Sequence, residues 1–98
     1  MFRNSSYDRI LAKELQDPEF SREFLIGLME GEEGLPLLDA LKHTIRGMGI
    51  KEFSETSGIP QKSISRMLHC ETIPKIETLD EYLAPFGLRT KIGLEEVA

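Results

Sequence analysis

Residues 50–68 of the chain are IKEFSETSGIPQKSISRML, and this stretch has the spacing of a helix-turn-helix. A small residue, Ser54, stands four positions before Gly58, and the apolar Ile64 follows that glycine six positions later. Two short helices that cross at a steep angle leave room only for a small side chain where they touch. The turn needs a residue that enters the left-handed region at little cost, which is glycine. We therefore expect Ser54, Gly58 and Ile64 to pack the two helices together.

The residues that follow Gly58 place polar and cationic side chains on the face opposite Ile64. They are Gln61, Lys62, Ser63, Ser65, Arg66 and His69. Arginine can bond bidentately to guanine and glutamine to adenine, while lysine suits a phosphate or a guanine. We expect these residues to contact DNA, with Gln61, Lys62 and Arg66 as the base-reading positions. The alternative is an ordinary solvated helix face.

The charge of the chain is divided unevenly along its length. The net charge of the 98 residues is −5, but residues 42–75 hold six Lys/Arg against three Asp/Glu. Four further cations of this basic part are expected along the DNA backbone, with an idle surface position as the alternative for each: Lys42, Arg46, Lys51 and Lys75. Residues 1–34 hold four Lys/Arg against eight Asp/Glu. That acidic excess is either a solvated face or a surface that attracts a basic protein partner.

Length and composition indicate one globular domain. Ninety-eight residues support a single core, and the one cysteine, Cys70, excludes an internal disulfide and favours a reducing cytoplasm. No apolar run approaches the length of a membrane span, and no basic-then-apolar leader opens the chain. We expect a cytoplasmic protein without a membrane partner.

Apolar periodicity and capping residues predict a mainly α-helical chain of five or six helices. Asp17-Pro18-Glu19 is a strong start signal, because it combines a capping aspartate, proline at the first helical position and an acid in the first turn. The predicted helices are one capped by Ser5 or Ser6, one from Pro18 to near Gly31, one from Pro36 to about Met48, one over residues 50–57, one over residues 60–70 and one from Ile76 to Phe86. Ile10, Met29 and Ile76 are expected on their buried stripes. We treat residues 1–34 as an N-terminal helical extension and residues 35–98 as the DNA-binding domain, within one compact unit.

The C-terminal tail has a different period. Leu88, Thr90, Ile92 and Leu94 alternate with polar residues or glycine, which predicts a short strand. A lone strand leaves its backbone donors and acceptors unpaired, so this one needs a partner. A homodimer is favoured, because two-fold symmetry also suits a palindromic operator. Another chain, or a short N-terminal strand near Phe2, is the alternative.

The wider pattern resembles a known family. The segment 53–68, followed by Pro74 and Glu77-Thr78-Leu79, is similar to the phage-repressor (Xre/Cro-like) helix-turn-helix proteins. The larger set resembles the addiction-module antidote family, a branch of HigA-type antitoxins, over roughly residues 7–94. That set comprises Tyr7, Leu11, Leu15, Asp17-Pro18-Glu19-Phe20, Leu25, Ala40-Leu41, Gly49, Ser57-Gly58-Ile59, Ser65-Arg66, Thr78-Leu79 and Phe86-Gly87-Leu88-Arg89.

This resemblance implies a lambda-repressor-like fold and a double function. The protein would neutralise a toxin of the RelE/ParE-like ribonuclease superfamily and would repress its own operon by binding operator DNA. By position, Gln61, Lys62 and Arg66 match base-reading residues of phage repressors, and Ser63 matches a phosphate- or base-contacting one. The competing hypotheses are a stand-alone phage-type regulator without a toxin and a helical protein-binding module.

Nothing in the sequence suggests an enzyme. There is no glycine-rich phosphate loop, no His-Glu-x-x-His motif and no recognisable nucleophile with its base. Two histidines and one cysteine are too few and too poorly spaced for a closed zinc site. We expect no cofactor, no metal and no small-molecule substrate.

Overall fold

The computed structural model describes the backbone from Ser6 to Val97 and the side chains from Arg9 to Val97. Over these residues the chain is mainly helical, as predicted, and compact. The elements are α1 (Ser6–Glu14), α2 (Pro18–Met29), α3 (Leu37–Met48), α4 (Ile50–Ser57), α5 (Gln61–Leu68), α6 (Ile76–Leu83) and the 3₁₀ helix η1 (Ala84–Phe86). The Ser5 cap and the strand near Phe2 concern residues outside the described part.

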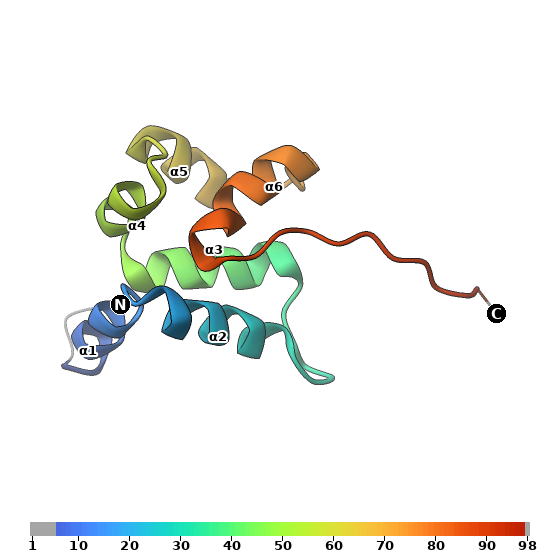
Figure 1. Cartoon of the computed structure of the whole chain (residues 1–98), viewed down its shortest axis with the longest axis horizontal. Coiled ribbons are helices and arrows are strands. Elements are labelled where there is room, and N and C mark those ends of the chain that lie inside the picture. Colours follow the sequence, from blue (N-terminus) through green and yellow to red (C-terminus); the bar gives the residue numbers. More distant parts are fainter. Residues whose placement is uncertain (1–5, 98) are drawn as a thin grey trace.

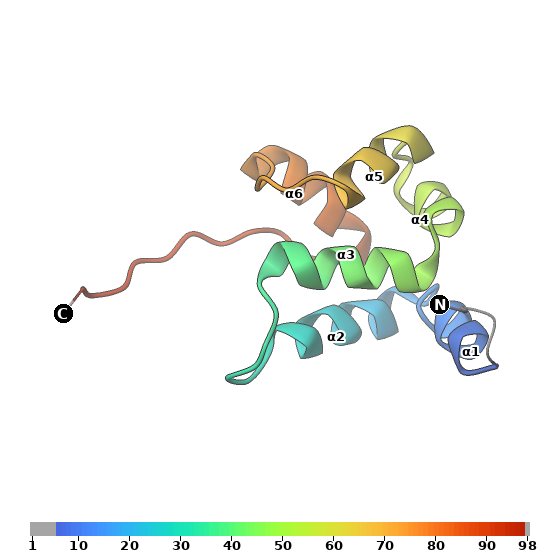
Figure 2. The same cartoon turned by 180° about the vertical axis from the view of Figure 1, so that it is seen from behind.

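Helix α3 runs through the middle of the molecule. Helix α2 lies antiparallel along one side of it, and α1 crosses near the end where α3 finishes (Figures 1 and 2). Helices α4, α5 and α6 cover the opposite side of α3, with α4 and α5 at one end and α6 toward the other. The predicted start of α2 is confirmed, because the Asp17 side chain accepts a hydrogen bond from the Glu19 amide at 3.1 Å and Pro18 is the first helical residue.

One hydrophobic core connects both parts of the sequence. Leu15 and Leu25, from residues 1–34, are 0% and 1% exposed and belong to the same buried cluster as Ile64 and Phe86. The first 34 residues therefore supply core side chains rather than lying outside the fold as an appendage. Deleting them would open the core of the remaining helices.

An aromatic stack joins α4, α6 and η1 at the centre of this core. The ring of Phe53 lies 6.0 Å from that of Tyr82 and 5.8 Å from that of Phe86, centroid to centroid. Both distances fall within the range in which an aromatic pair contributes stabilisation in addition to that from its buried surface area. The stack fixes α4, and therefore the turn that follows it, against the C-terminal helices.

Three apolar residues that periodicity placed on buried stripes are exposed instead. Ile10, Met29 and Ile76 are 57%, 39% and 46% exposed. Met29 is the last residue of α2 and Ile76 the first of α6. The burial predicted for all three residues is wrong. For Met29 and Ile76 the reason is that the apolar stripe continues to the end of the helix, whereas the neighbouring helix that would cover it does not; the exposure of Ile10, in the middle of α1, has no such explanation.

The predicted C-terminal strand is not formed within the single chain. Residues 88–97 carry no regular structure, and the tail leaves the helices beside the beginning of α3 (Figures 1 and 2). Leu88 packs against the core, and both the amide and the hydroxyl of Thr90 donate to Asp80 Oδ1 at 2.8 Å. Ile92 and Leu94 are 79% and 103% exposed. The first two strand residues therefore find partners in their own chain, and only the last two remain without one among the described residues.

The Asp80–Thr90 contact makes the attachment of the tail sensitive to pH. The Thr90 amide, followed by its hydroxyl, holds the pKa of Asp80 below its ordinary value. A carboxyl group with a lowered folded-state pKa stabilises the structure above its unfolded pKa of about 3.9, and this contribution is lost as the pH falls through the lower folded value. We expect the Thr90 amide resonance to move toward its random-coil position below about pH 4, and Asp80→Asn to abolish this titration. An unchanged resonance between acidic and neutral pH would contradict the contact.

Candidate nucleic-acid interface

The connection between α4 and α5 is a short turn held by local hydrogen bonds. Gly58 ends α4 with φ 80° and ψ 2°, in the left-handed region that the sequence required of it, and its amide donates to the Ser54 carbonyl at 2.8 Å. The Ser54 hydroxyl donates to the Ile59 carbonyl at 2.6 Å, and the Ile59 amide donates to Ser57 Oγ at 3.1 Å. The Ser54 side chain therefore has two roles. It is small enough for the two helices to cross closely, and its hydroxyl forms a hydrogen bond that holds the turn.

Helix α5 has a sharp division between buried and exposed faces. Ile64, Met67 and Leu68 are 0%, 6% and 4% exposed and anchor the helix in the core. The residues predicted to face DNA are exposed or half-buried: Gln61, Lys62, Arg66 and His69 are exposed, and Ser63 and Ser65 are half-buried. At about 100° per residue, positions 61, 62, 65, 66 and 69 fall within about 140° of the helix circumference. The exposed residues therefore share one face, whereas Ser63 lies at its margin.

The carbonyl end of α5 is tied down by basic side chains. Arg46 Nη2 donates to the Leu68 carbonyl at 2.8 Å, and Lys42 Nζ donates to the Cys70 carbonyl. The His69 ring donates from Nδ1 to the Ser65 carbonyl at 2.8 Å. These carbonyls lie at or just beyond the helix end, where backbone acceptors lack helical partners and the helix dipole favours positive charge. Two adjacent turns of α3 thus hold the end of the polar helix in place.

This arrangement gives Lys42 and Arg46 a structural role that the sequence did not predict. Both were expected along the DNA backbone, and each side chain also bonds to one of the chain's own carbonyls. The sequence placed them correctly in the basic segment, whereas the direction in which they point depends on the packing of α3 against α5. The two other cations of that group, Lys51 and Lys75, are exposed on α4 and at the N-cap of α6.

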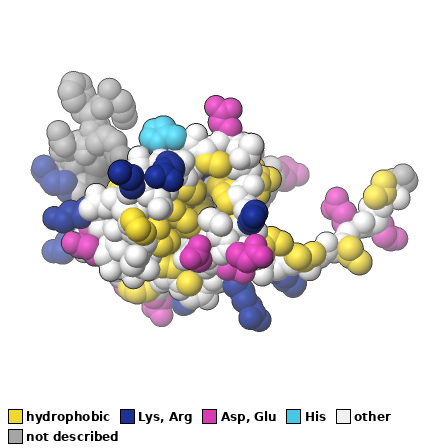
Figure 3. Space-filling model, turned by 90° about the horizontal axis from the view of Figure 1, so that it is seen from above, with side chains coloured by type: hydrophobic (Ala, Val, Ile, Leu, Met, Phe, Trp, Pro, Cys, Tyr) yellow, Lys and Arg dark blue, Asp and Glu magenta, His cyan; other side chains and the backbone are white. Residues whose placement is uncertain are grey.

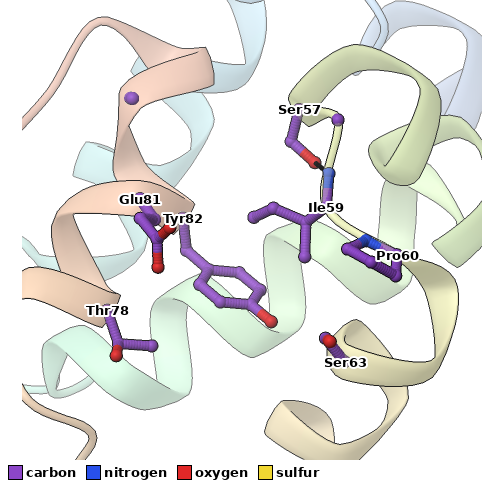
Figure 4. Close-up of a pocket in the computed structure, with 9 residues that line it drawn as sticks. Ser57, Ile59, Pro60, Ser63, Thr78, Glu81 and Tyr82 are labelled. Atoms are coloured by element: carbon purple, nitrogen blue, oxygen red, sulfur yellow. Dashed lines mark hydrogen bonds between the residues drawn. The ribbon is translucent and has the colours of Figure 1, made fainter.

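A hollow that the sequence did not predict lies between the α4–α5 turn and α6. It has a volume of about 570 Å³ and is bordered by Ile59, Pro60 and Ser63 on one side and by Thr78, Glu81 and Tyr82 on the other (Figure 4). The Tyr82 ring extends from α6 with its hydroxyl toward Pro60 and Ser63. Burial, and secondarily the negative charge of Glu81, raise the pKa of Tyr82. Because Glu81 is the charged residue of its lining, the hollow is unsuited to a phosphate.

The surface over these helices shows the division of charge in three dimensions. Figure 3 looks down on α4, α5 and α6; two Lys or Arg groups lie beside a histidine, more lie at the same end of the molecule, and others lie on the side toward the tail. Asp and Glu groups lie mainly toward the centre and the α6 side. A polyanion such as DNA would be attracted to the cationic groups beside the histidine and repelled by the acidic groups.

The described part of the chain carries neither a cluster of metal ligands nor a membrane-spanning helix. No three His, Cys, Asp or Glu side chains there are grouped as metal ligands. None of the helices from α1 to α6 has the length and apolar character needed to cross a bilayer. Comparison of the chain with protein-family models, with curated proteins and with solved structures gave no match.

Proposed function

We propose that this chain is a DNA-binding protein in which α4 and α5 form a helix-turn-helix and α5 is the recognition helix. The observation that carries the proposal is the exposure of Gln61, Lys62 and Arg66 together on a short helix whose opposite face is buried. A recognition helix must be rigid, because its side chains have to meet base edges in fixed register. The core contacts of Ile64 and Met67 and the tethered carbonyl end supply that rigidity.

In this proposal the arrangement of helices is lambda-repressor-like, and two copies act as a homodimer on a palindromic operator. Each α5 enters a major groove, with Arg66 on a guanine, Gln61 on an adenine and Lys62 on a phosphate or guanine. Ser63, Ser65 and His69 are secondary contacts, and Lys51 and Lys75 are candidates for the flanking phosphates.

The proposal extends to an antitoxin that represses its own operon. Its support is the resemblance drawn from the sequence, together with the acidic residues of the N-terminal third. Glu14, Glu19, Glu23, Glu30, Glu32 and Glu33 are all exposed, whereas the Asp8 side chain lies outside the described part. An acidic surface would steer a basic, RNA-cleaving toxin of the RelE/ParE-like kind toward the protein and speed their association.

The DNA-binding part is tested by fluorescence anisotropy on the duplex upstream of the gene and on a shuffled duplex of equal composition. We expect tighter binding to the upstream duplex. We also expect the logarithm of the association constant to fall linearly with the logarithm of salt concentration, by about 0.9 for each phosphate contacted. Equal affinity for both duplexes, or binding that does not respond to salt, would refute it.

The antitoxin part is tested by co-expression with the neighbouring open reading frame. We expect that frame to inhibit growth when expressed alone, and to be neutralised by and co-purify with this chain. A matched variant carrying Gln at Glu30, Glu32 and Glu33 keeps the fold and should capture the toxin more slowly. Deletion of residues 1–33 is not a clean test, because it removes the buried Leu15 and Leu25. A harmless neighbour that does not co-purify would leave the stand-alone regulator as the function.

A further inference from the structure

We propose that the C-terminal tails of two copies pair antiparallel about Ile92, so that the tail of each copy covers an apolar groove on the other. This inference names the contact surface of the homodimer in the proposed function and rests on it. It follows from three features of the tail: its free backbone edge, its self-complementary sequence, and the groove that lies beside its attachment point.

The first feature is the direction of the backbone hydrogen bonds. The amides of Leu88 and Thr90 both point inward, because they donate to the Leu83 carbonyl at 3.2 Å and to Asp80 Oδ1 at 2.8 Å. In an extended chain, successive backbone groups point to opposite sides. The amides and carbonyls of the alternate residues Arg89, Lys91 and Gly93 therefore point outward, and none of them has a hydrogen bond within residues 6–97. One edge of the tail is thus occupied by its own chain and the other is open to a second strand.

The second feature is a sequence that complements itself when reversed about Ile92. In that register Ile92 faces its own copy, Thr90 faces Leu94, and Arg89 faces Glu95. At the centre of this pairing, apolar side chains meet apolar or methyl-bearing ones on one face, and opposite charges meet on the other, whereas Leu88, which packs on its own core, lies opposite Glu96. A register centred on Lys91 would bring two lysines together, which is unfavourable. This two-fold complementarity identifies a second copy of the chain, rather than an unrelated protein, as the partner.

The third feature is an apolar groove of about 280 Å³ beside the start of the tail. Its lining comes from α2, the first residue of α3, α6 and residues 88–91, and includes Leu25, Ile26, Met29, Leu37, Leu83 and Leu88. Ile26 and Met29 are 38% and 39% exposed there. A cavity of about 150 Å³ holds a benzene molecule, so this groove has room for aliphatic side chains. Leu94 of the second copy, lying opposite Thr90, would be placed over it.

Together these features explain two exposed groups of apolar side chains at once. Among the described residues, Ile92 and Leu94 have no side-chain partner, and the groove beside the start of the tail is open. A two-fold pairing places the exposed side chains of each tail against the groove and tail of the other copy. This contact therefore forms twice per dimer.

The register is tested by disulfide cross-linking in a Cys70→Ser background. Ile92→Cys would face its own copy at a non-hydrogen-bonded position, where Cα atoms lie about 4.5 Å apart and a disulfide can form. Leu94→Cys is the matched control, because the two copies of residue 94 would be separated by four residues, or about 13 Å. We expect a covalent dimer from the first variant and not from the second. Cross-linking of both to the same extent, or of Leu94→Cys alone, would overturn the register.

Ile92→Asp tests the interface independently of cross-linking. Because Ile92 is 79% exposed in the single chain, the helix content measured by circular dichroism should equal that of the wild type. Loss of both buried isoleucines should weaken the dimer roughly a hundredfold or more, as measured by analytical ultracentrifugation. A variant that stays dimeric would refute the tail contact but leave the proposed homodimer standing. A wild-type protein that is monomeric at the concentrations that saturate DNA would refute both.

Discussion

Arg66→Ala is expected to abolish most of the preference for the operator while leaving binding to random DNA nearly intact. A bidentate arginine–guanine contact contributes about 1–3 kcal/mol of discrimination, and a dimer on a palindrome makes it twice. The loss on the operator should therefore be about 2–6 kcal/mol, or between about 30-fold and about 10⁴-fold in affinity. The affinity for random DNA should fall only by the contribution of one cationic side chain per copy. Anisotropy titrations on both duplexes at one salt concentration measure the difference.

The matched control is Lys13→Ala, which removes an exposed cation from the last turn of α1, on the other side of α3 from α5. It should leave both affinities almost unchanged. Equal losses on operator and random DNA for Arg66→Ala would reassign Arg66 to the DNA backbone. If neither duplex were affected, α5 would not be the recognition helix.

Phe53→Ala is expected to bring the protein close to unfolding at growth temperature. Phe53 is 0% exposed and stacks on both Tyr82 and Phe86, so its removal leaves a cavity where three elements meet. Such truncations reduce the free energy of unfolding by about 3–5 kcal/mol, out of about 5–15 kcal/mol for a domain of this size. Urea titration followed by circular dichroism measures the change.

Phe20→Ala provides a comparison with the same side chain at a half-buried position. Phe20 is stacked on Phe24 at 6.3 Å at the edge of the core, and its loss should reduce stability by less. Equal destabilisation by both substitutions would show that the stack around Phe53 is not the centre of the fold. The prediction concerns stability alone and stands whether or not the chain binds DNA.

The contrast between Arg66 and Arg46 shows where reasoning from sequence stopped. Both are basic residues in the last turns of amphipathic helices, and both were assigned to DNA. Both are exposed, but Arg46 also donates to the Leu68 carbonyl, 22 residues away. No local pattern specifies that contact, because it depends on where the end of α5 comes to rest against α3.

The tail shows a limit of another kind. Alternation predicted that Leu88, Thr90, Ile92 and Leu94 share one face of a strand, but it could not say what covers them. Within residues 9–97, Leu88 reaches the core and Thr90 reaches Asp80, while Ile92 and Leu94 are 79% and 103% exposed. A strand forms only when another strand pairs with it. An alternating pattern therefore predicts that a segment can join a sheet, but not that it is a strand in the single chain.

The sequence by itself determined the helices, the turn at Gly58 and the division of α5 into an apolar and a polar face. These depend on dihedral preferences, capping and a repeat of 3.6 residues, all of which act over a few neighbouring positions. Tertiary structure alone decided that residues 1–34 share the core, that Lys42 and Arg46 hold the end of α5, and that a groove opens beside Thr90. Each of these joins residues far apart in the chain, and side-chain direction over such separations is set by how the helices pack.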